Sequence, residues 1–371
     1  MADIRLIRLA KILVEYSLGI KKGDYLAIQG AVVAQPLMKE VTRLAARKGA
    51  MVDVYTNLPE IKRVFLENAG PDQLKRTPLL MKTFLGDYDK NLTLFGETNT
   101  RELNSLPPQK LKASMQGVKK IREKFFKRMG ENKVSWCGSI FPTNPLAQEA
   151  GMALEEYEDF VYGACFCDKP DPVALWKKMS RKQEKVAAFL NRAKEIHIMA
   201  PGTDLRASVK GRRWVNCDGK VNLPDGEVFT GPVETSINGH IRFSFPGIYM
   251  SKEVDDIYLE FKDGKVVKAR AAKGEGLLHQ LLKTDAGAPF VGELAVGTNH
   301  GIQTFTRNML FDEKIGGTVH LAIGAGFPET GSKNRSSLHW DMLCDMRKGG
   351  RLSVDGKLAY KNGKFVDNRL N

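Results

Sequence analysis

The sequence predicts an α/β protein, with an N-terminal open parallel α/β sheet domain followed by a β-rich α+β domain. Short apolar runs alternate with helix-like segments over the first half, as in parallel sheets with crossover helices. From about residue 195 the runs are separated by hairpin-type dipeptides such as Asp263-Gly264 and Asn362-Gly363. The length of 371 residues exceeds what one core usually serves, so we expect two domains, residues 1–194 and 195–371.

The first domain is expected to open with an amphipathic helix, because charges are scattered at helical spacing through residues 1–13. Four apolar runs then predict strands at 25–30, 51–55, 91–96 and 134–137. Helical patterns are expected at 36–48, 60–68, 108–128, 147–162 and 172–192. No G-x-G-x-x-G motif follows any of these strands, so a dinucleotide-binding site is not expected.

The second domain is expected to begin where the helix predicted at 172–192 ends. Strand-like runs occur at 205–209, 241–245 and 257–261. One helical segment, at about 275–283, interrupts the strands. The glycine-bearing turns between the runs are typical of a β-rich domain.

Composition and charge narrow the class of protein. An apolar content of 42% and a charged content of 27% are ordinary for a globular enzyme. The chain has no apolar run long enough to span a membrane and its N-terminus lacks the regions of a signal peptide, so we expect a cytoplasmic protein with no membrane partner. The net charge of +14 is spread along the chain without a nucleic-acid-binding motif, so nucleic acid is not an expected partner.

The five cysteines also favour a reducing compartment. Their number is odd, and Cys165-Phe166-Cys167 does not have the spacing of a CxxC redox or zinc motif. We therefore predict reduced structural thiols.

Two histidines and three carboxylates in apolar segments form the most informative pattern of the chain. His320 lies in a strand-like run, and His339 and Asp341 alternate, so both can project from one face of a strand. Glu227 and Glu293 are single acids in otherwise apolar segments, where burial is costly without a partner or a metal. Imidazole and carboxylate are ligands that Zn, Co and Mn accept. The pattern predicts a site built from separate strands, suited to two divalent ions that share a carboxylate.

Each of these residues also has an ordinary structural explanation. His320 could be a satisfied core residue, and His339 and Asp341 a simple imidazole–carboxylate contact. Glu227 could be an exposed acid at a hairpin rim, and Glu293 could be exposed to solvent. The acidic pair Asp312-Glu313 is a candidate further member, as a ligand or a proton shuttle. Neither G-x-S-x-G nor H-E-x-x-H occurs, so a serine hydrolase of that type and a zincin are not expected.

Five motifs occur in a fixed order in the second half of the chain. They are Leu223–Thr230, Gly292–Ala295, Leu310–Glu313, His320–Gly324 and Leu338–Met342. Together they resemble the thermophilic aminopeptidase (AmpS/PepS-type) family of metallopeptidases, and the resemblance covers essentially the whole chain. It implies a cytoplasmic, homodimeric exopeptidase that removes N-terminal residues from peptides at a two-metal site holding Zn, Co or Mn.

The resemblance also implies roles for individual residues. The metal ligands would be Glu227, Glu293, His320, His339 and Asp341, with Glu293 as the bridge between the ions. Glu313 corresponds to a family glutamate, although the interval from Glu313 to His320 is two residues longer here than in the family. Glu313 or Glu293 would carry the proton to the leaving nitrogen.

Phe327 is a departure from the family, which has a tyrosine at this place after the first histidine. A phenyl ring can neither ligate a metal nor donate a hydrogen bond. We expect Phe327 to border the substrate pocket, in a slower enzyme, in one where Tyr360 or Lys333 supplies the donor, or in a catalytically impaired member that binds peptide or metal. The loop at 331–335 could line the same pocket or be solvated.

Overall fold

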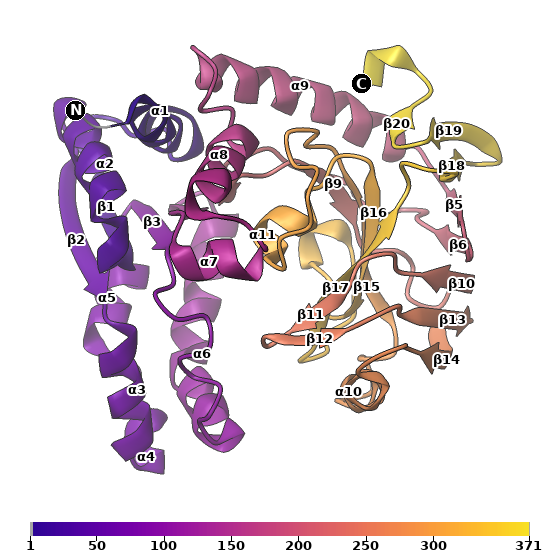
Figure 1. Cartoon of the computed structure of the whole chain (residues 1–371), viewed down its shortest axis with the longest axis horizontal. Coiled ribbons are helices and arrows are strands. Elements are labelled where there is room, and N and C mark those ends of the chain that lie inside the picture. The colour runs from indigo at the N-terminus through magenta and orange to yellow at the C-terminus, as the bar shows by residue number, and fades with distance from the viewer. Residues whose placement is uncertain (1–2, 371) are drawn as a thin grey trace. The chain divides into compact units, whose positions relative to one another are not determined.

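The structure is a computed structural model that describes residues 3–370 and divides into two compact units (Figure 1). The first unit consists of Met1–Ala174 and Gly219–Pro224, and the second of Leu175–Asp218 and Asp225–Asn371. The domain boundary expected at residue 194 falls just after helix α9 (Pro172–Leu190). The compact units divide near the start of this helix, because Val186, Ala187 and Leu190 belong to the hydrophobic core of the second unit.

A five-stranded parallel sheet forms the centre of the first unit, as the alternating pattern predicted. The strand order is β2-β1-β3-β4-β8, and all neighbouring pairs are parallel. The strands are β1 (Tyr25–Ala31), β2 (Met51–Asn57), β3 (Lys90–Phe95), β4 (Ser135–Ile140) and β8 (Asn222–Leu223). Strand β1 buries Leu26, Ala27 and Ile28 completely, whereas the edge strand β2 leaves Met51 and Val54 exposed.

The helices of the first unit follow the order that the sequence predicted, with two additions between β2 and β3. They are α1 (Ile4–Ile12), α2 (Gln35–Arg47), α3 (Pro59–Asn68), α4 (Pro71–Leu74), α5 (Leu79–Gly86), α6 (Pro108–Gly130), α7 (Asn144–Glu149) and α8 (Leu154–Ala164). Proline in the first turn starts α2, α3, α6 and α7, where its missing N–H leaves no helical hydrogen bond unmade. The single helix expected at 147–162 is wrong: Gly151, at φ +68°, turns the chain between α7 and α8.

Two antiparallel sheets and one short hairpin make up most of the second unit. The larger sheet has the order β14-β13-β10-β6-β5-β18-β19-β20, and the smaller has the order β17-β16-β15-β9-β7. The strands of the larger sheet are β5 (Glu195–Ala200), β6 (Thr203–Ser208), β10 (Asn238–Arg242), β13 (Tyr258–Lys262), β14 (Lys265–Arg270), β18 (Arg351–Val354), β19 (Lys357–Lys361) and β20 (Lys364–Phe365). The smaller sheet contains β7 (Val215–Cys217), β9 (Glu227–Thr230), β15 (Val291–Gly297), β16 (Thr318–Gly324) and β17 (His339–Asp345). The remaining elements are the hairpin β11 (Gly247–Tyr249) and β12 (Lys252–Val254), with helices α10 (Glu275–Leu282) and α11 (Met309–Asp312).

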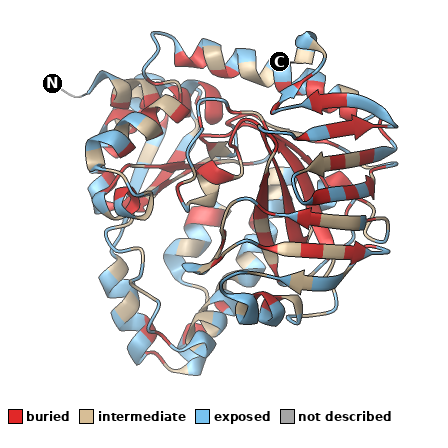
Figure 2. Cartoon of the chain, turned by 45° about the vertical axis from the view of Figure 1, so that its right-hand side comes forward, coloured by how far each residue is buried: buried red, intermediate tan, exposed pale blue. Residues whose placement is uncertain are grey.

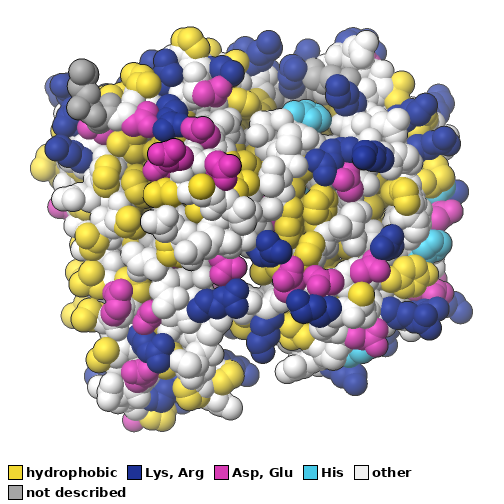
Figure 3. All heavy atoms as spheres, in the orientation of Figure 1, with side chains coloured by type: hydrophobic (Ala, Val, Ile, Leu, Met, Phe, Trp, Pro, Cys, Tyr) yellow, Lys and Arg dark blue, Asp and Glu magenta, His cyan; other side chains and the backbone are white. Residues whose placement is uncertain are grey.

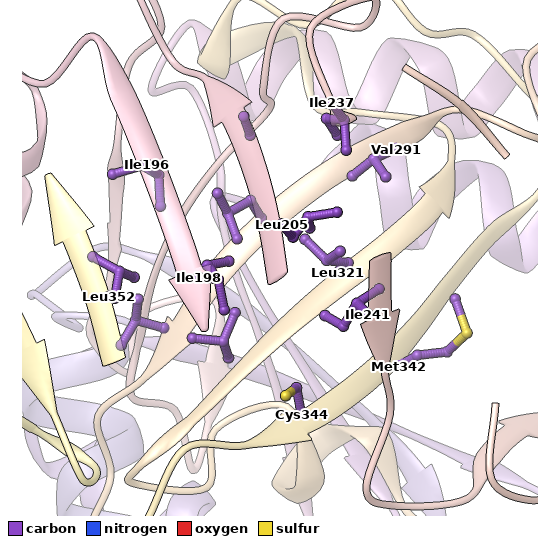
Figure 4. Packing of buried hydrophobic residues seen from close by; sticks show 14 of the residues in the cluster. Ile196, Ile198, Leu205, Ile237, Ile241, Val291, Leu321, Met342, Cys344 and Leu352 are labelled. Carbon is purple, nitrogen blue, oxygen red and sulfur yellow. The ribbon is translucent and has the colours of Figure 1, made fainter. Parts of the chain in front are cut away.

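The core of the second unit lies between its two sheets. Leu205 and Ile241 of the larger sheet meet Leu321 and Met342 of the smaller one in a single hydrophobic cluster (Figure 4). Strands β9, β15 and β16 of the smaller sheet are buried along their whole length, whereas the edge strand β7 is half-buried (Figure 2). Burial of this apolar surface is the main force that holds the two sheets together.

The predicted fold class is confirmed, since a parallel α/β sheet and a separate antiparallel β-rich unit are both present. No pattern in the sequence indicated β8. This two-residue strand belongs to the parallel sheet of the first unit, although the segments that precede and follow Gly219–Pro224 belong to the second unit. Among residues 3–370, none of the helices has the length and hydropathy needed to cross a membrane.

Candidate metal centre

One face of the smaller sheet carries all five residues of the predicted site. Along β9, β16 and β17, alternate side chains belong to the hydrophobic core, and those between them point to the opposite face. In β15 a bulge between Val291 and Glu293 shifts the alternation, so that Leu294 and Val296 belong to the core and Glu293 lies on the other face. In β16, for example, Val319, Leu321 and Ile323 belong to the core, and His320 lies on the other face. The same alternation places Glu227, Glu293, His339 and Asp341 beside His320 on that face.

Small residues in the strand ladder leave room for the polar side chains. Ala322 pairs with Glu293 on one side and with Asp341 on the other, so these three residues form one row across three strands. Gly324 pairs with His339 in the same way. A larger side chain at position 322 would stand between the two carboxylates, because directly paired residues share a face.

The polar side chains form a continuous chain of short distances. His320 Nε2 lies 3.2 Å from Glu227 Oε2 and 3.7 Å from Glu293 Oε1. His339 Nε2 lies 3.5 Å from Glu293 Oε2 and 3.3 Å from Asp341 Oδ2. The two oxygens of Glu293 therefore face different histidines. Glu293 belongs to two candidate ligand groups, one with Glu227 and His320 and one with His339 and Asp341, and within each group the ligand atoms lie within 4.8 Å of one another.

Several buried polar atoms at the centre have no hydrogen-bond partner within the described part of the chain. They are Glu227 Oε2, both ring nitrogens of His320 and Asp341 Oδ1. Burying such groups without a partner is costly, and a divalent cation would satisfy carboxylate and imidazole atoms together. The residues therefore fit divalent metal ions, and Glu227, Glu293, His320, His339 and Asp341 supply the ligand types.

The carboxylates impose a strongly negative potential on the two histidines. Burial disfavours a charged imidazole, but Glu293 and Glu227 outweigh it and raise the pKa of His320 to about 9. At His339 burial has the same effect, and Asp341 and Glu293 outweigh it to give a pKa of about 10. Burial would raise the pKa of Asp341, but His339 lowers it to about 2. The carboxylates thus stabilise the positive charge of both histidines in the metal-free chain, and the same negative potential favours binding of divalent cations.

A turn that follows α11 brings two more charged side chains to the centre. Glu313 forms a ligand group with His320 and Asp341, again within 4.8 Å, and burial raises the pKa of Glu313 to about 8. Lys314 has no exposed side-chain surface, donates to Glu227 Oε1 at 3.1 Å and contacts Glu313 Oε1. Glu313 was predicted from the sequence but Lys314 was not, because its neighbours Glu313 and Ile315 do not distinguish it from a surface lysine.

Asp312, the other half of the acidic pair, lies away from the centre. Its Oδ1 accepts hydrogen bonds from the backbone N–H of Thr306 at 2.7 Å and from the Thr306 hydroxyl at 2.9 Å. Burial raises the pKa of Asp312 to about 7. Asp312 therefore anchors the segment that precedes α11.

Phe327 borders the centre. Its ring lies 5.3 Å from the ring of His339 and 5.2 Å from that of Phe229, and 38% of the residue is exposed. The carbonyl oxygen of Ala325, two residues earlier, lies 2.8 Å from His339 Nδ1. That contact orients the imidazole with Nε2 toward Glu293 and Asp341.

The loop at 331–335 is anchored more than its sequence suggested. Ser332 and Asn334 are buried, and the carboxylate of Glu234 accepts from the Ser332 hydroxyl and from the backbone N–H of Lys333. The side chain of Lys333 remains a candidate donor. Tyr360 was a wrong candidate, because it lies on β19 of the larger sheet, buried in the hydrophobic core.

The sequence model of one protein family, described as thermophilic metalloprotease (M29), matches residues 2–365. The chain belongs to this family. Aminopeptidase T of Thermus thermophilus is 27% identical over 400 aligned positions, which cover 96% of this chain and 95% of the relative. Aminopeptidase PepS of Streptococcus thermophilus is 26% identical over 413 positions, covering 96% and 97%. The solved structure of wild-type AmpT from Thermus thermophilus matches with a TM-score of 0.85 at 24% identity, covering 98% of this chain and 99% of that one.

Membership of the M29 family confirms three predictions made from the sequence. The family resemblance is correct, the fold is that of a solved relative, and the protein is a metallopeptidase and so a hydrolase.

Proposed function

We propose that this protein is a metal-dependent aminopeptidase that hydrolyses the N-terminal peptide bond of peptides at a centre for two divalent ions. The observation that carries the proposal is the position of Glu293, whose two oxygens face two different histidines. The relatives named aminopeptidase support the exopeptidase activity, since they align with this chain over almost its full length.

In this proposal Glu227, Glu293 and His320 would hold one ion, and Glu293, His339 and Asp341 would hold the other. The donor set of imidazole and carboxylate suits Zn, Co or Mn. When bound, the ions supply Lewis acidity, which polarises the scissile carbonyl and makes water a better nucleophile near neutral pH. The chain itself supplies the orientation, because rigid paired strands carry all five ligands.

Glu313 is the proposed group that moves the proton. Its carboxyl group lies within 4.8 Å of ligand atoms of His320 and Asp341, where it can reach a water molecule held at the centre. Glu313 would take a proton from the attacking water and deliver it to the leaving nitrogen. Glu293 is the alternative, and its carboxylate is more fully engaged with the two histidines.

Phe327 is proposed to line the substrate pocket beside His339. Because its ring lacks a hydroxyl, it offers no hydrogen bond to a developing oxyanion, and loss of one such donor can cost on the order of 100- to 1000-fold in rate. A catalytically impaired member that binds peptide or metal is therefore the second candidate function.

Homodimer formation is part of the proposal, and exposed apolar side chains on the first unit support it. Helix α3 and the residue before it expose Leu58, Ile61, Val64 and Phe65. Three of these, at i, i+3 and i+4, share one face of the helix, and an apolar face of this kind is typical of a contact surface.

On the face of the molecule in Figure 3, Lys and Arg lie scattered among acidic and apolar side chains, so a nucleic-acid partner is not proposed. A cytoplasmic location is proposed because the cysteines are predicted to be reduced structural thiols.

The test combines metal loading with matched substrates. Metal-free protein is loaded with Co, Mn or Zn and incubated with short peptides whose N-termini are free or acetylated. We expect about two ions per chain and release of the first residue from the free peptides alone. Uptake of two ions without release under any metal would favour the impaired member, and cleavage of the acetylated peptides would contradict an aminopeptidase.

A further inference from the structure

Lys314 is the buried cation of the metal centre. Among residues 3–370 it is the only lysine or arginine that is fully buried as a whole residue, and its ammonium group contacts two carboxylates, those of Glu227 and Glu313. An ammonium without water is retained only when such partners compensate it. The burial of Lys314 therefore depends on the carboxylates of this cluster.

The backbone around Lys314 fixes where its side chain starts. The Lys314 N–H donates to the carbonyl of Phe311 at 3.0 Å, and its carbonyl accepts from the backbone N–H of Asn299 at 3.2 Å. The side chain of Asn299 donates to the carbonyl of Asp225 at 2.8 Å, two residues before Glu227. One loop thus holds both the lysine turn and the start of the strand that carries Glu227.

The contact with Lys314 divides the carboxylate of Glu227 between two tasks. Oε1 accepts from the ammonium at 3.1 Å, while Oε2 faces His320 Nε2 at 3.2 Å and has no hydrogen-bond partner in the described chain. Only Oε2 is left for a cation beside His320. Without the ammonium, both oxygens would be free to turn toward that cation.

The charge of the cluster leads to the same conclusion. Of the four carboxyl groups of the centre, the Lys314 ammonium contacts two, those of Glu227 and Glu313, and leaves those of Glu293 and Asp341 to the histidines. Lys314 therefore adds a positive charge without occupying the groups that Glu293 shares with the histidines. A cation built into the chain therefore also limits how many oxygens the ions can recruit.

We propose that Lys314 is a positioning residue of the metal centre, which restricts Glu227 to one-oxygen ligation and holds Glu313 beside the reacting groups. The inference rests on the proposed two-ion aminopeptidase. It concerns coordination and not the number of ions, so the variant should still bind metal. Groups that support a ligand in this way are commonly worth about 10- to 100-fold in activity or metal affinity.

The test replaces the ammonium with an uncharged group of similar length. In Lys314→Met, cobalt binding should persist at wild-type stoichiometry, but the visible absorption of Co²⁺ should lose intensity, since a second oxygen from Glu227 raises the coordination number. The kcat should fall by about 10- to 100-fold with little change in KM. The matched control is Lys265→Met, which removes an exposed lysine on β14 and should leave spectrum and kcat unchanged.

Three outcomes separate the possibilities. A cobalt spectrum and kcat equal to those of the wild type would overturn the inference, and so would loss of cobalt binding by a folded variant, which would make Lys314 merely structural. If Lys314→Met does not fold, the double variant Lys314→Met with Glu313→Gln removes one charge of each sign and must show the same loss of visible intensity. A wild-type chain that takes up no cobalt would instead refute the proposed function itself.

Discussion

Asp312 should make the stability of the chain depend on pH, and replacing it with asparagine should remove that dependence. Its carboxyl group is buried, Oδ1 accepts two hydrogen bonds from Thr306, and Oδ2 has no hydrogen-bond partner in the described chain. The amide of the Asp312→Asn variant would keep an oxygen for Thr306 and could not ionise. The comparison therefore isolates the cost of a buried negative charge.

The sign follows from the raised pKa of Asp312 in the folded chain. Burial moves it from 3.8 to about 7, so the folded state holds its proton where the unfolded state has lost it. Below pH 3.8 the group is neutral in both states and its favourable contribution is complete. Between pH 3.8 and about 7 that contribution is lost as the pH rises, and the loss approaches ~4 kcal/mol at about 1.36 kcal/mol per pH unit.

The assay is urea unfolding of metal-free wild type and Asp312→Asn between about pH 4 and 8. We expect the free energy of unfolding of the variant, relative to the wild type, to rise by up to ~4 kcal/mol across that range. Asp263→Asn, in the exposed turn between β13 and β14, is the matched control, since it makes the same substitution at the surface. A difference between Asp312→Asn and wild type that stays constant over the whole range would refute the reasoning.

Three further predictions concern the metal centre. Glu293→Ala should lose both ions, because it removes the shared carboxylate, whereas Glu227→Ala should keep about one ion per chain by elemental analysis; equal losses would argue against a bridge. Phe327→Tyr restores a hydroxyl beside His339 and should raise kcat by about 100-fold if a missing donor limits the rate, with an unchanged kcat showing that it does not. Chelation should lower the Tm, since ions at about 1000 times their Kd stabilise the folded chain by ~4 kcal/mol, and a Tm unaffected by chelation and by added Zn would contradict ion binding.

The period-two alternation of strands explains why the five site residues could be predicted from the sequence. His339 and Asp341 must share a face if their segment is a strand, and the apolar residue between them, Trp340, must then enter the core. The same reasoning applies to Glu293 between its apolar neighbours. The alternation is a local property, so it is visible without the fold; the roles of these residues as ligands remain proposals.

Other features depend on tertiary contacts that no local pattern records. Lys314 is one of 57 basic residues, and only the turn after α11 makes it a buried partner of Glu227. Tyr360 was a reasonable donor by composition but lies in the other sheet. Strand β8 has two residues, too few for any hydrophobic period to appear. In each case the position of the residue or strand depends on contacts between segments that are distant in the sequence.

The partition of the smaller sheet into two faces explains how this chain can bury so many charges. The core-facing residues of β15, β16 and β17 are packed against the larger sheet, and their burial holds the strands in register regardless of what the other face carries. That register sets Ala322 between Glu293 and Asp341, so two like charges are kept close without a side chain between them. Burial, together with the negative charges of Asp341 and Glu227, raises the pKa of Glu293, and bound cations would offset that repulsion. The stability of the hydrophobic face therefore permits the electrostatic strain on which tight cation binding at the opposite face depends.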